Sequence, residues 1–531
     1  MLTFGREDRI VKRQRKKIRI KGFFKSYISG FLRAALVALL VSAQFAFIFF
    51  LAYQLRSAGI YVYFAVELAA FVIIIGLLKT HTNYLFKIGW LSIITLLPIA
   101  GLIMYFLWGR ERTLRQVRKT GKALLEYGNR FEIPDAEAKD AFIRRFPAGE
   151  TRMNYLESQG FRLYTDNTFE YFSSGEDAFE AVIEDFENAE KFIFISFFIV
   201  AEGGLWERIK PILIDKARAG VEIRFIYDDF GSMFRTDKLF WKELEEAGVR
   251  VACFNPIQKY VAKLYLNYRD HQKIIVIDGN IGYTGGFNLA DEYINAIERF
   301  GYWKDGGVRI YGPGVFGITR IFLDMWGITM GSNSEDYDRF RPDAVFEKAD
   351  RFCQCISDGP INYKSNPIEA SITQMVYNAS DFMYITTPYL ILEDSLSEAL
   401  CIQAKAGTDV RLIIPGIPDK KGVYELTKYN CGKLLENGVR VFVYTPGFVH
   451  NKTYVTRDCA LVGSINTDFR SFYLHFECGT FIWDNDLVNE IVNDYKETFD
   501  QCHEMTYEEW RNRPVMEKIK QYILNIFAAL A

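Results

Sequence analysis

The chain has little histidine, and its cysteines follow no metal-binding spacing. Its 531 residues include five histidines and eight cysteines. Cys353 and Cys355 are too close for a common disulfide, the other cysteines are scattered, and no zinc-binding spacing occurs. The sequence therefore gives no indication of a zinc site, and its cysteines do not assign the chain to one side of a membrane.

Most of the chain lacks net positive charge. Residues 1–122 carry 20 Lys and Arg against 4 Asp and Glu, a net charge of +16, whereas the whole chain carries −2. Residues 123–531 therefore carry −18. Nucleic-acid grooves are basic, so this acidic body disfavours a nuclease and a nucleic-acid partner. The basic residues of the first segment flank apolar runs, where they suit anionic lipid headgroups.

Three apolar runs occupy the first part of the chain. They cover residues 34–53, residues 60–78 with Glu67 as their one charge, and residues 88–108, which contain Pro98. Each is long enough to cross a hydrocarbon core as a helix. No small-residue cleavage site follows a short apolar core, which disfavours a signal peptide. The sequence predicts an integral membrane protein whose residues 1–122 form the basic N-terminus and the membrane-inserted segments.

The basic flanks also predict an orientation. Residues 1–25 hold ten basic side chains and residues 110–122 hold six more. If both flanks are cytoplasmic, the number of spans must be even, which conflicts with three runs. One explanation is that one run is re-entrant or interfacial, and the run containing Glu67 is then the candidate. The other is that one basic flank is not cytoplasmic. We expect a cytoplasmic catalytic body.

Beyond about residue 150 the sequence is duplicated. Strands and helices alternate there, which is typical of an α/β fold. Three segments recur: residues 191–196 match 381–386, residues 219–226 match 406–413, and residues 247–251 match 437–441. We expect two α/β/α units packed as a pseudo-dimer with one site on their axis. The boundaries we predict are 123–330 and 355–512 for the halves, 331–354 for a linker and 513–531 for an amphipathic C-terminal helix.

Each half contains one copy of a short polar phrase. His271 and Lys273 precede an apolar strand, and His450 and Lys452 repeat the pattern. Residues two apart on a strand share a face. A histidine can attack phosphorus or carry a proton, and lysine and asparagine can hold phosphoryl oxygens. The phosphate-binding candidates follow each phrase in a Gly-Gly-x-Asn or Gly-Ser-x-Asn segment: Asn288, Ser464 and Asn466.

The repeated H-x-K-x4-D-x6-G-[GS]-x-N pattern resembles the phospholipase D superfamily. Four other segments narrow the resemblance to bacterial cardiolipin synthases: residues 266–271, 301–305, 414–421 and 473–479. Residues 98–101 and 108–110 are similar to the membrane segment of that family. The resemblance covers nearly the whole chain and implies a multi-pass protein of the bacterial cell membrane.

The resemblance implies transfer of a phosphatidyl group between two phosphatidylglycerol molecules, which gives cardiolipin and glycerol. His271 would attack phosphorus and form a phosphohistidine, and His450 would act as general acid and base. Lys273, Lys452 and the two asparagines would neutralise the phosphoryl oxygens, so that neither metal nor cofactor is required. Membrane phospholipids, phosphatidylglycerol and cardiolipin, are the implied partners.

Four carboxylates complete the predicted site. Asp305 and Glu477 occupy matching places in the two halves and are our candidates for orienting the imidazoles. Asp278 belongs to the first motif, whereas the second has Arg457 in that place and Asp458 next. The second motif is one residue shorter before its glycine, which indicates a deletion in the turn. In the family this aspartate is thought to be structural, so we expect a repaired turn.

Other functions remain open at this point. A phospholipase D that transfers the phosphatidyl group to water or to another alcohol would use the same catalytic residues. A non-catalytic membrane scaffold is compatible with the altered second motif, and a nuclease is disfavoured by charge.

Overall fold

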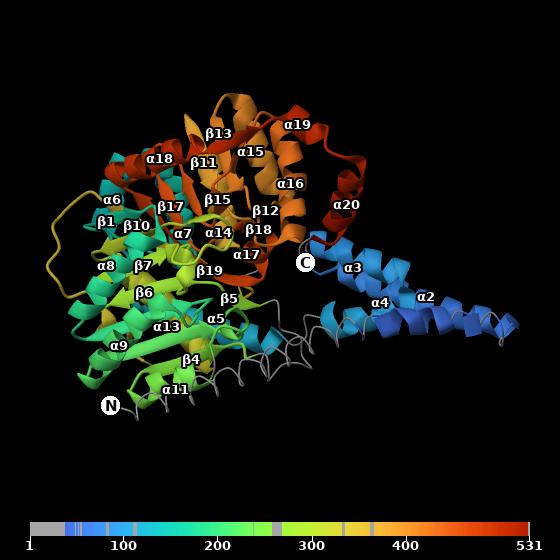
Figure 1. Ribbon diagram of the computed structural model, residues 1–531, viewed down its shortest axis with the longest axis horizontal. Helices are drawn as coiled ribbons and strands as arrows, with labels where there is room; N and C mark the ends of the chain where they lie inside the picture. Colours follow the sequence, from blue (N-terminus) through green and yellow to red (C-terminus); the bar gives the residue numbers. More distant parts are fainter. Residues whose placement is uncertain are drawn as a thin grey trace, which may run out of the picture.

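The computed structural model describes residues 35, 38–47, 49–50, 53, 56–80, 84–109, 114–236, 238–256, 268–331, 335–361 and 366–528. The basic segment 1–25 and parts of the first apolar run, 34–53, lie outside the described residues. The body contains two sheets with the same strand order, and the N-terminal helices α2, α3 and α4 project from it as an arm (Figure 1).

The first half is built on a seven-stranded sheet of order β1-β9-β7-β6-β2-β3-β4. Its strands are β1 (Thr168–Phe172), β2 (Phe192–Phe197), β3 (Glu222–Asp228), β4 (Arg250–Phe254), β6 (Lys273–Ile277), β7 (Ile281–Gly285) and β9 (Gly307–Tyr311). Its helices are α8 (Gly175–Asn188), α9 (Gly204–Arg218), α10 (Asp229–Ser232), α11 (Lys238–Glu246) and α13 (Val315–Met330). The central strand β2 is buried at all six positions, which agrees with a sequence that is apolar except at Ser196.

The second half repeats this order as β10-β19-β17-β16-β11-β13-β14, with β20 added at the edge. Its strands are β10 (Phe352–Asp358), β11 (Phe382–Thr386), β13 (Asp409–Pro415), β14 (Arg440–Tyr444), β16 (Thr453–Val455), β17 (Ala460–Gly463), β19 (His475–Trp483) and β20 (Cys502–Met505). Its helices are α14 (Pro367–Tyr377), α15 (Asp394–Ala406), α16 (Lys421–Glu436), α17 (Phe469–Tyr473), α18 (Asn485–Phe499) and α19 (Tyr507–Arg511). The matching orders confirm the predicted duplication of an α/β unit.

Short strands cross between the halves. In the first half, β8 (Tyr302–Lys304) pairs in parallel with β15 (Gly447–Val449) of the second half. In the opposite direction, β5 (Arg269–Asp270) pairs in parallel with β19. One hydrophobic core contains residues of both sheets, so the halves form a continuous body.

The predicted bounds of the first half, 123–330, include helices that the structure packs against the second half. The helices α6 (Ala136–Arg145) and α7 (Glu150–Ser158) lie in the predicted first half but pack into the core of the second. The Phe142 ring lies 5.4 Å from Phe352 and 4.9 Å from Trp483, measured between centroids. In addition, β10 begins at Phe352, inside the predicted linker. The buried face of α6 contains Ala138 and Phe142, but an amphipathic sequence does not identify the sheet that buries it.

We expected the run containing Glu67 to be the re-entrant or interfacial one, and the structure of the N-terminal arm corrects this expectation. The helix α2 (Arg56–Leu78) contains Glu67, and its part Tyr61–Leu78 is the one described helix long and apolar enough to span a membrane. The run containing Pro98 is instead divided into α3 (Tyr84–Leu96) and α4 (Pro98–Met104). A helix of 13 residues is about 20 Å long, short of a hydrocarbon core of about 30 Å.

Pro98 explains this break, because proline starts a helix readily but disrupts one that continues through it. The two short helices then pack closely: a side-chain carbon at Gly101 would lie 2.7 Å from the carbonyl oxygen of Ile93. The Pro98 run is therefore the helical hairpin, and the Glu67 run is the candidate span.

The C-terminal segment forms the helix α20 (Val515–Ile526) beside α3 (Figure 1). Gln521 is buried and donates to Glu425 and Glu517, which fixes one face of the helix against α16. The opposite face exposes apolar side chains: Val515, Met516, Ile519, Tyr522, Ile523 and Ile526.

Candidate active site

The crossing strands bring the two polar phrases together. His271 follows β5, and its backbone N–H donates to the carbonyl of Phe476 in β19 over 2.9 Å. His450 follows β15, and its backbone N–H donates to the carbonyl of Lys304 in β8 over 2.7 Å. The residue after Phe476 is Glu477, and the residue after Lys304 is Asp305. Each histidine therefore lies beside a carboxylate that belongs to the other half.

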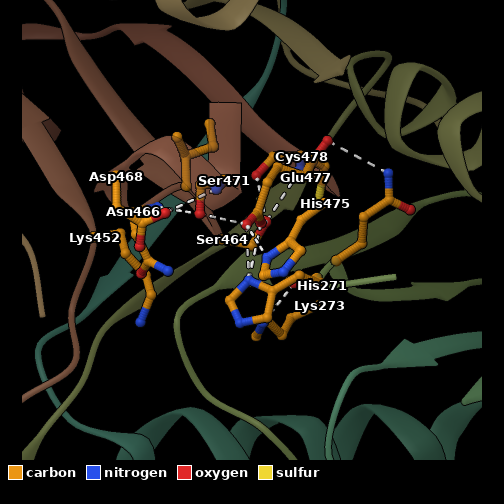
Figure 2. Close-up of polar contacts among 12 residues, drawn as sticks. His271, Lys273, Lys452, Ser464, Asn466, Asp468, Ser471, His475, Glu477 and Cys478 are labelled. Atoms are coloured by element: carbon orange, nitrogen blue, oxygen red, sulfur yellow. Dashed lines mark hydrogen bonds and ion pairs between the residues drawn. The ribbon is translucent and has the colours of Figure 1, made fainter. Parts of the chain in front are cut away.

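Glu477 of the second half holds His271 of the first. The Nδ1 atom of His271 lies 2.9 Å and 3.1 Å from the two carboxylate oxygens of Glu477, which is fully buried (Figure 2). Ser464 and Ser471 both donate hydroxyl hydrogen bonds to the same carboxylate. A carboxylate with these donors accepts the Nδ1 proton of His271, so the Nε2 atom keeps its lone pair.

Asp305 of the first half holds His450 of the second in the same way. Its Oδ2 atom lies 2.8 Å from Nδ1 of His450, and its Oδ1 atom accepts the backbone N–H of Gly306. A side-chain carbon at Gly286 would lie 2.0 Å from Oδ1 of Asp305, so only glycine leaves room for this carboxylate. Burial alone would raise the pKa of Asp305, but the charge of His450 and the hydrogen bond to it hold that pKa below its usual value.

The two lysines of the phrases are buried beside the histidines. Lys273 donates to the backbone carbonyl of His271, and Lys452 donates to that of His450. Burial lowers the pKa of Lys273 to about 8 and that of Lys452 to about 7. Two desolvated ammonium groups that face one site favour an anion between them, because a negative phosphoryl group restores the charge balance.

Both histidines are neutral at neutral pH. Burial is the main cause that places the pKa of His271 well below its usual value, and the charge of Lys273 adds to it. Burial, followed by the charge of Lys452, lowers the pKa of His450 to about 4. A neutral imidazole with its Nδ1 proton held by a carboxylate presents a nucleophilic Nε2 atom. An anionic substrate would counteract the effect of the lysines and favour proton uptake by a histidine.

The predicted phosphate ligands differ in their surroundings. The Asn288 amide donates to the Tyr293 hydroxyl, and its oxygen accepts the backbone N–H of Ile199, so its side chain is occupied in the loop. The side-chain oxygen of Asn466 is buried and has no hydrogen-bond partner among the described residues. A phosphoryl oxygen needs a donor, and an amide oxygen only accepts, so the predicted phosphate contacts of Asn288 and Asn466 stay predictions.

Ser464 corrects our expectation of a direct phosphate contact. Its hydroxyl donates to Glu477, lies 3.2 Å from the carbonyl oxygen of Cys478, and accepts the backbone N–H of Cys478. The pairing of Gly463 with Gly479 in the register of β17 and β19 brings Ser464 to this position. The hydroxyl thus supports the carboxylate that holds His271.

The motif aspartates lie away from the histidines. Asp278 is seven residues beyond His271, or roughly 20 Å along an extended chain. Its carboxylate accepts backbone N–H groups of residues 190–192 and so ties the β6–β7 turn to the start of β2. In the second half Asp458 is exposed, and Arg457 forms an ion pair with Asp381 at the matching place. The structure places neither aspartate in the site, and Arg457 provides the repaired turn.

Two residues that sequence reasoning left aside also lie in the site. Ser471 donates to Glu477 over 2.7 Å, and the imidazole of His475 lies 5.3 Å from that of His271 between centroids. No sequence pattern distinguished Ser471, which lies in the five-residue helix α17, six residues before Glu477. His475 is buried, and burial lowers its pKa to about 3.

One group in the described part of the chain has atoms close enough to hold a metal ion. Ligand atoms of His271, His475 and Glu477 lie within 4.8 Å of one another. Both oxygens of Glu477 already accept hydrogen bonds from hydroxyl groups and from His271, so a cation would have to displace these donors. We therefore assign these atoms to the hydrogen-bond network of His271.

Two family models match the chain. One, described as cardiolipin synthase, PLD-like domain, matches residues 182–298 and 372–503, one segment in each half. The other, described as phospholipase D-nuclease N-terminal, matches residues 68–110 of the arm. A crystal structure of phosphatidylserine synthase from Haemophilus influenzae has a TM-score of 0.56 at 15% identity, covering 71% of this chain and 98% of that one. The duplicated fold and paired histidine motifs define a protein of the phospholipase D superfamily.

Similar proteins identify the family within this superfamily. An uncharacterized protein of Streptococcus mutans is 36% identical, covering 86% of this chain and 99% of its own length. The cardiolipin synthase of Listeria monocytogenes is 32% identical and the major cardiolipin synthase ClsA of Bacillus subtilis is 34% identical, each covering 83% of this chain and 93% of the relative. The chain belongs to the cardiolipin synthase family.

Proposed function

We propose that this protein is a cardiolipin synthase that transfers a phosphatidyl group from one phosphatidylglycerol to the terminal hydroxyl of a second, releasing glycerol. The observation that carries this proposal is the crossed pair of histidine–carboxylate contacts, His271 with Glu477 and His450 with Asp305. Two imidazoles with fixed tautomers and two buried ammonium groups match a double displacement at phosphorus.

In the first step, Nε2 of His271 attacks the phosphorus atom, and the bond from phosphorus to the glycerol oxygen breaks. His450, protonated in the presence of the anionic lipid, gives its proton to the departing oxygen. In the second step, neutral His450 takes the proton of the incoming hydroxyl, whose oxygen attacks phosphorus and releases His271. Lys273, Lys452 and Asn466 hold the non-bridging oxygens throughout.

The experiment is an assay of the purified full-length protein in detergent micelles that contain phosphatidylglycerol as the only lipid. We expect cardiolipin and glycerol in equal amounts. Phosphatidic acid without cardiolipin would instead identify a hydrolase. His271→Ala and His450→Ala should each reduce turnover by roughly 10⁴-fold, and full activity in either variant would contradict a shared site.

The assignment of His271 as nucleophile needs its own test. We expect acid quenching during turnover to trap a phosphatidyl group on His271, which peptide mapping by mass spectrometry identifies. The variant His450→Ala should still form this adduct, slowly, whereas His271→Ala should not. An adduct on His450 would reverse the two roles.

We further propose a multi-pass membrane protein with its catalytic body in the cytoplasm. The exposed apolar surfaces of α2 and α20 support membrane insertion and interfacial contact, and the basic residues around the arm support the orientation. A reporter fused after Ala531 that is active only in the cytoplasm should be active, and activity of an exclusively periplasmic or extracellular reporter would contradict this topology.

A further inference from the structure

The acceptor in the proposed reaction, a second phosphatidylglycerol, carries a negative charge of its own. Lys273 and Lys452 face the phosphoryl group that is transferred. The acceptor brings a phosphodiester of its own, one glycerol length from the reacting phosphorus. Glycerol and water compete with phosphatidylglycerol for the same phosphohistidine. A site that discriminates against glycerol and water must therefore recognise this second negative charge.

Lys420 has the position and the chemistry for this contact. It ends the loop 416–420, whose residue Ile417 donates its backbone N–H to the carbonyl of Gly447 in β15. Since β15 leads directly into His450, the loop is fastened beside the catalytic phrase. Burial is the largest cause of the low pKa of His271, but the charge of Lys420 also contributes, so this ammonium acts on the site.

A partly buried tyrosine and an aspartate hold Lys420 in place. The Nζ atom of Lys420 donates to the hydroxyl of Tyr389 over 3.1 Å and lies 4.7 Å from the centre of its ring. The same hydroxyl donates to Oδ2 of Asp419 over 2.6 Å. The Tyr389 ring lies 6.5 Å from that of Phe448, which lies 5.7 Å from His450. Two rings, those of Tyr389 and Phe448, thus connect Lys420 with the catalytic imidazole.

Lys420 keeps donors for a ligand despite its acidic neighbour. Asp419 lies 3.7 Å from Nζ, longer than a direct hydrogen bond, and its nearer oxygen already accepts from Tyr389. The Lys420 side chain is 60% exposed, and an ammonium group has three N–H donors, one of which Tyr389 uses.

The loop also adjoins the lipid-facing side of the molecule. Three residues after Lys420, Val423 packs against a cluster that contains Ile391, Leu426, Phe469 and Ala528, together with Phe86 of α3. Apolar side chains therefore lead from the membrane arm to the start of α16, where Lys420 lies. An acceptor lipid with its chains on that side would present its phosphodiester to Lys420 and its glycerol to His450.

We propose that Lys420, positioned by Tyr389 and Asp419, binds the phosphodiester of the acceptor phosphatidylglycerol and so selects an anionic lipid over neutral alcohols and water. This subsite rests on the proposed synthase function and deepens it. It assigns the acceptor preference to a residue outside the two catalytic phrases.

Two reactions of the full-length protein separate the acceptor from the donor. Cardiolipin formation requires the anionic acceptor. Incorporation of labelled glycerol into phosphatidylglycerol reverses the first displacement and uses a neutral acceptor, so it reports only on the donor side. The variants are Lys420→Gln, Lys420→Arg and the control Lys421→Gln, which removes the adjacent exposed lysine on the first turn of α16.

We expect Lys420→Gln to lower cardiolipin formation at low phosphatidylglycerol content by roughly tenfold or more, through a raised KM for the acceptor, because one charge-assisted contact is lost. Glycerol exchange should stay within about twofold of the wild type. Lys420→Arg should recover most of the cardiolipin formation, and Lys421→Gln should change neither reaction.

Equal losses in both reactions, or no loss in either, would overturn the subsite. These outcomes differ from a failure of the proposed function. A wild-type protein that exchanges glycerol or releases phosphatidic acid but forms no cardiolipin would contradict the synthase assignment itself.

Discussion

Glu477 reaches across the boundary between the two halves to hold His271, with its Oε1 atom 2.9 Å from Nδ1 of the imidazole. The reverse contact, from Asp305 to His450, has a separation of 2.8 Å. Because each half supplies a histidine and the carboxylate of the other histidine, neither half contains a complete catalytic pair. The short strands β5 and β8 cause this exchange of carboxylates, because each belongs to the first half and pairs with a strand of the second.

Replacement of Glu477 by glutamine should abolish most of the activity while leaving the shape of the site intact. The new amide would donate toward Nδ1 of His271, which forces the ring proton onto Nε2 and removes the nucleophilic lone pair. We expect a loss of roughly 10²–10⁴-fold in kcat, measured as cardiolipin formation. Glu477→Asp keeps the charge and should retain more activity than Glu477→Gln; the opposite order would contradict the tautomer argument.

The matching positions Gly286 and Ser464 should respond differently to substitution. Gly286→Ala places a carbon atom 2.0 Å from Asp305, so we expect a loss of at least about 10²-fold in activity. Ser464→Gly removes one donor to Glu477 and should cost roughly tenfold.

Gly422→Ala is the control for both variants, because an added carbon there meets no atom within 4 Å. It should leave turnover unchanged. Equal losses of activity in Gly286→Ala and Ser464→Gly would contradict the structure, in which Asp305 and Glu477 have different surroundings.

The two catalytic lysines should give the enzyme an alkaline limit. Burial brings the pKa of Lys273 to about 8 and that of Lys452 to about 7, so both lose their proton as the pH rises through this range. We expect kcat/KM, which reports on the free enzyme, to fall with a midpoint between about 7 and 8. Bound phosphodiester stabilises the charged lysines, so the alkaline limb of kcat should lie at higher pH.

The variant Lys452→Arg checks the origin of this limit. An arginine keeps its charge over the whole range, so the residual activity should decline at higher pH than that of the wild type. An unchanged midpoint in Lys452→Arg and in Lys273→Arg would exclude the lysines as its cause.

Phe142→Ala should destabilise the second half, although the residue precedes both sheets in the chain. The side chain is fully buried against Phe352 and Trp483, and loss of such a ring costs about 3–5 kcal/mol. Hydrogen exchange should accelerate in β10 and β19 more than in β2 and β3. Ile133→Ala, at a side chain that is 70% exposed, should change the free energy of unfolding by less than about 0.5 kcal/mol.

The duplication and the two catalytic phrases could be predicted from the sequence because each leaves a local pattern. Glycine before a buried strand marks the repeats, and His271 and Lys273 share a strand spacing that recurs at His450 and Lys452. The strand orders of the two sheets confirm the duplication.

The crossed contacts have no such local pattern. The strands β5 and β15 are two and three residues long, and their partners lie far away in the chain, so no periodicity reveals the pairing. The same limit explains Ser464, whose role depends on the register between β17 and β19. The helix α6 illustrates a third case, since an amphipathic face predicts burial without identifying the sheet that covers it.

The distance of 206 residues between His271 and Glu477 has a consequence during synthesis. At 5–20 residues per second, the ribosome adds this stretch in roughly 10–40 s. Throughout that time the membrane arm and the first histidine already exist, but the imidazole has no carboxylate to fix its proton. A chain that ends before Glu477 therefore lacks the carboxylate that fixes the tautomer of His271.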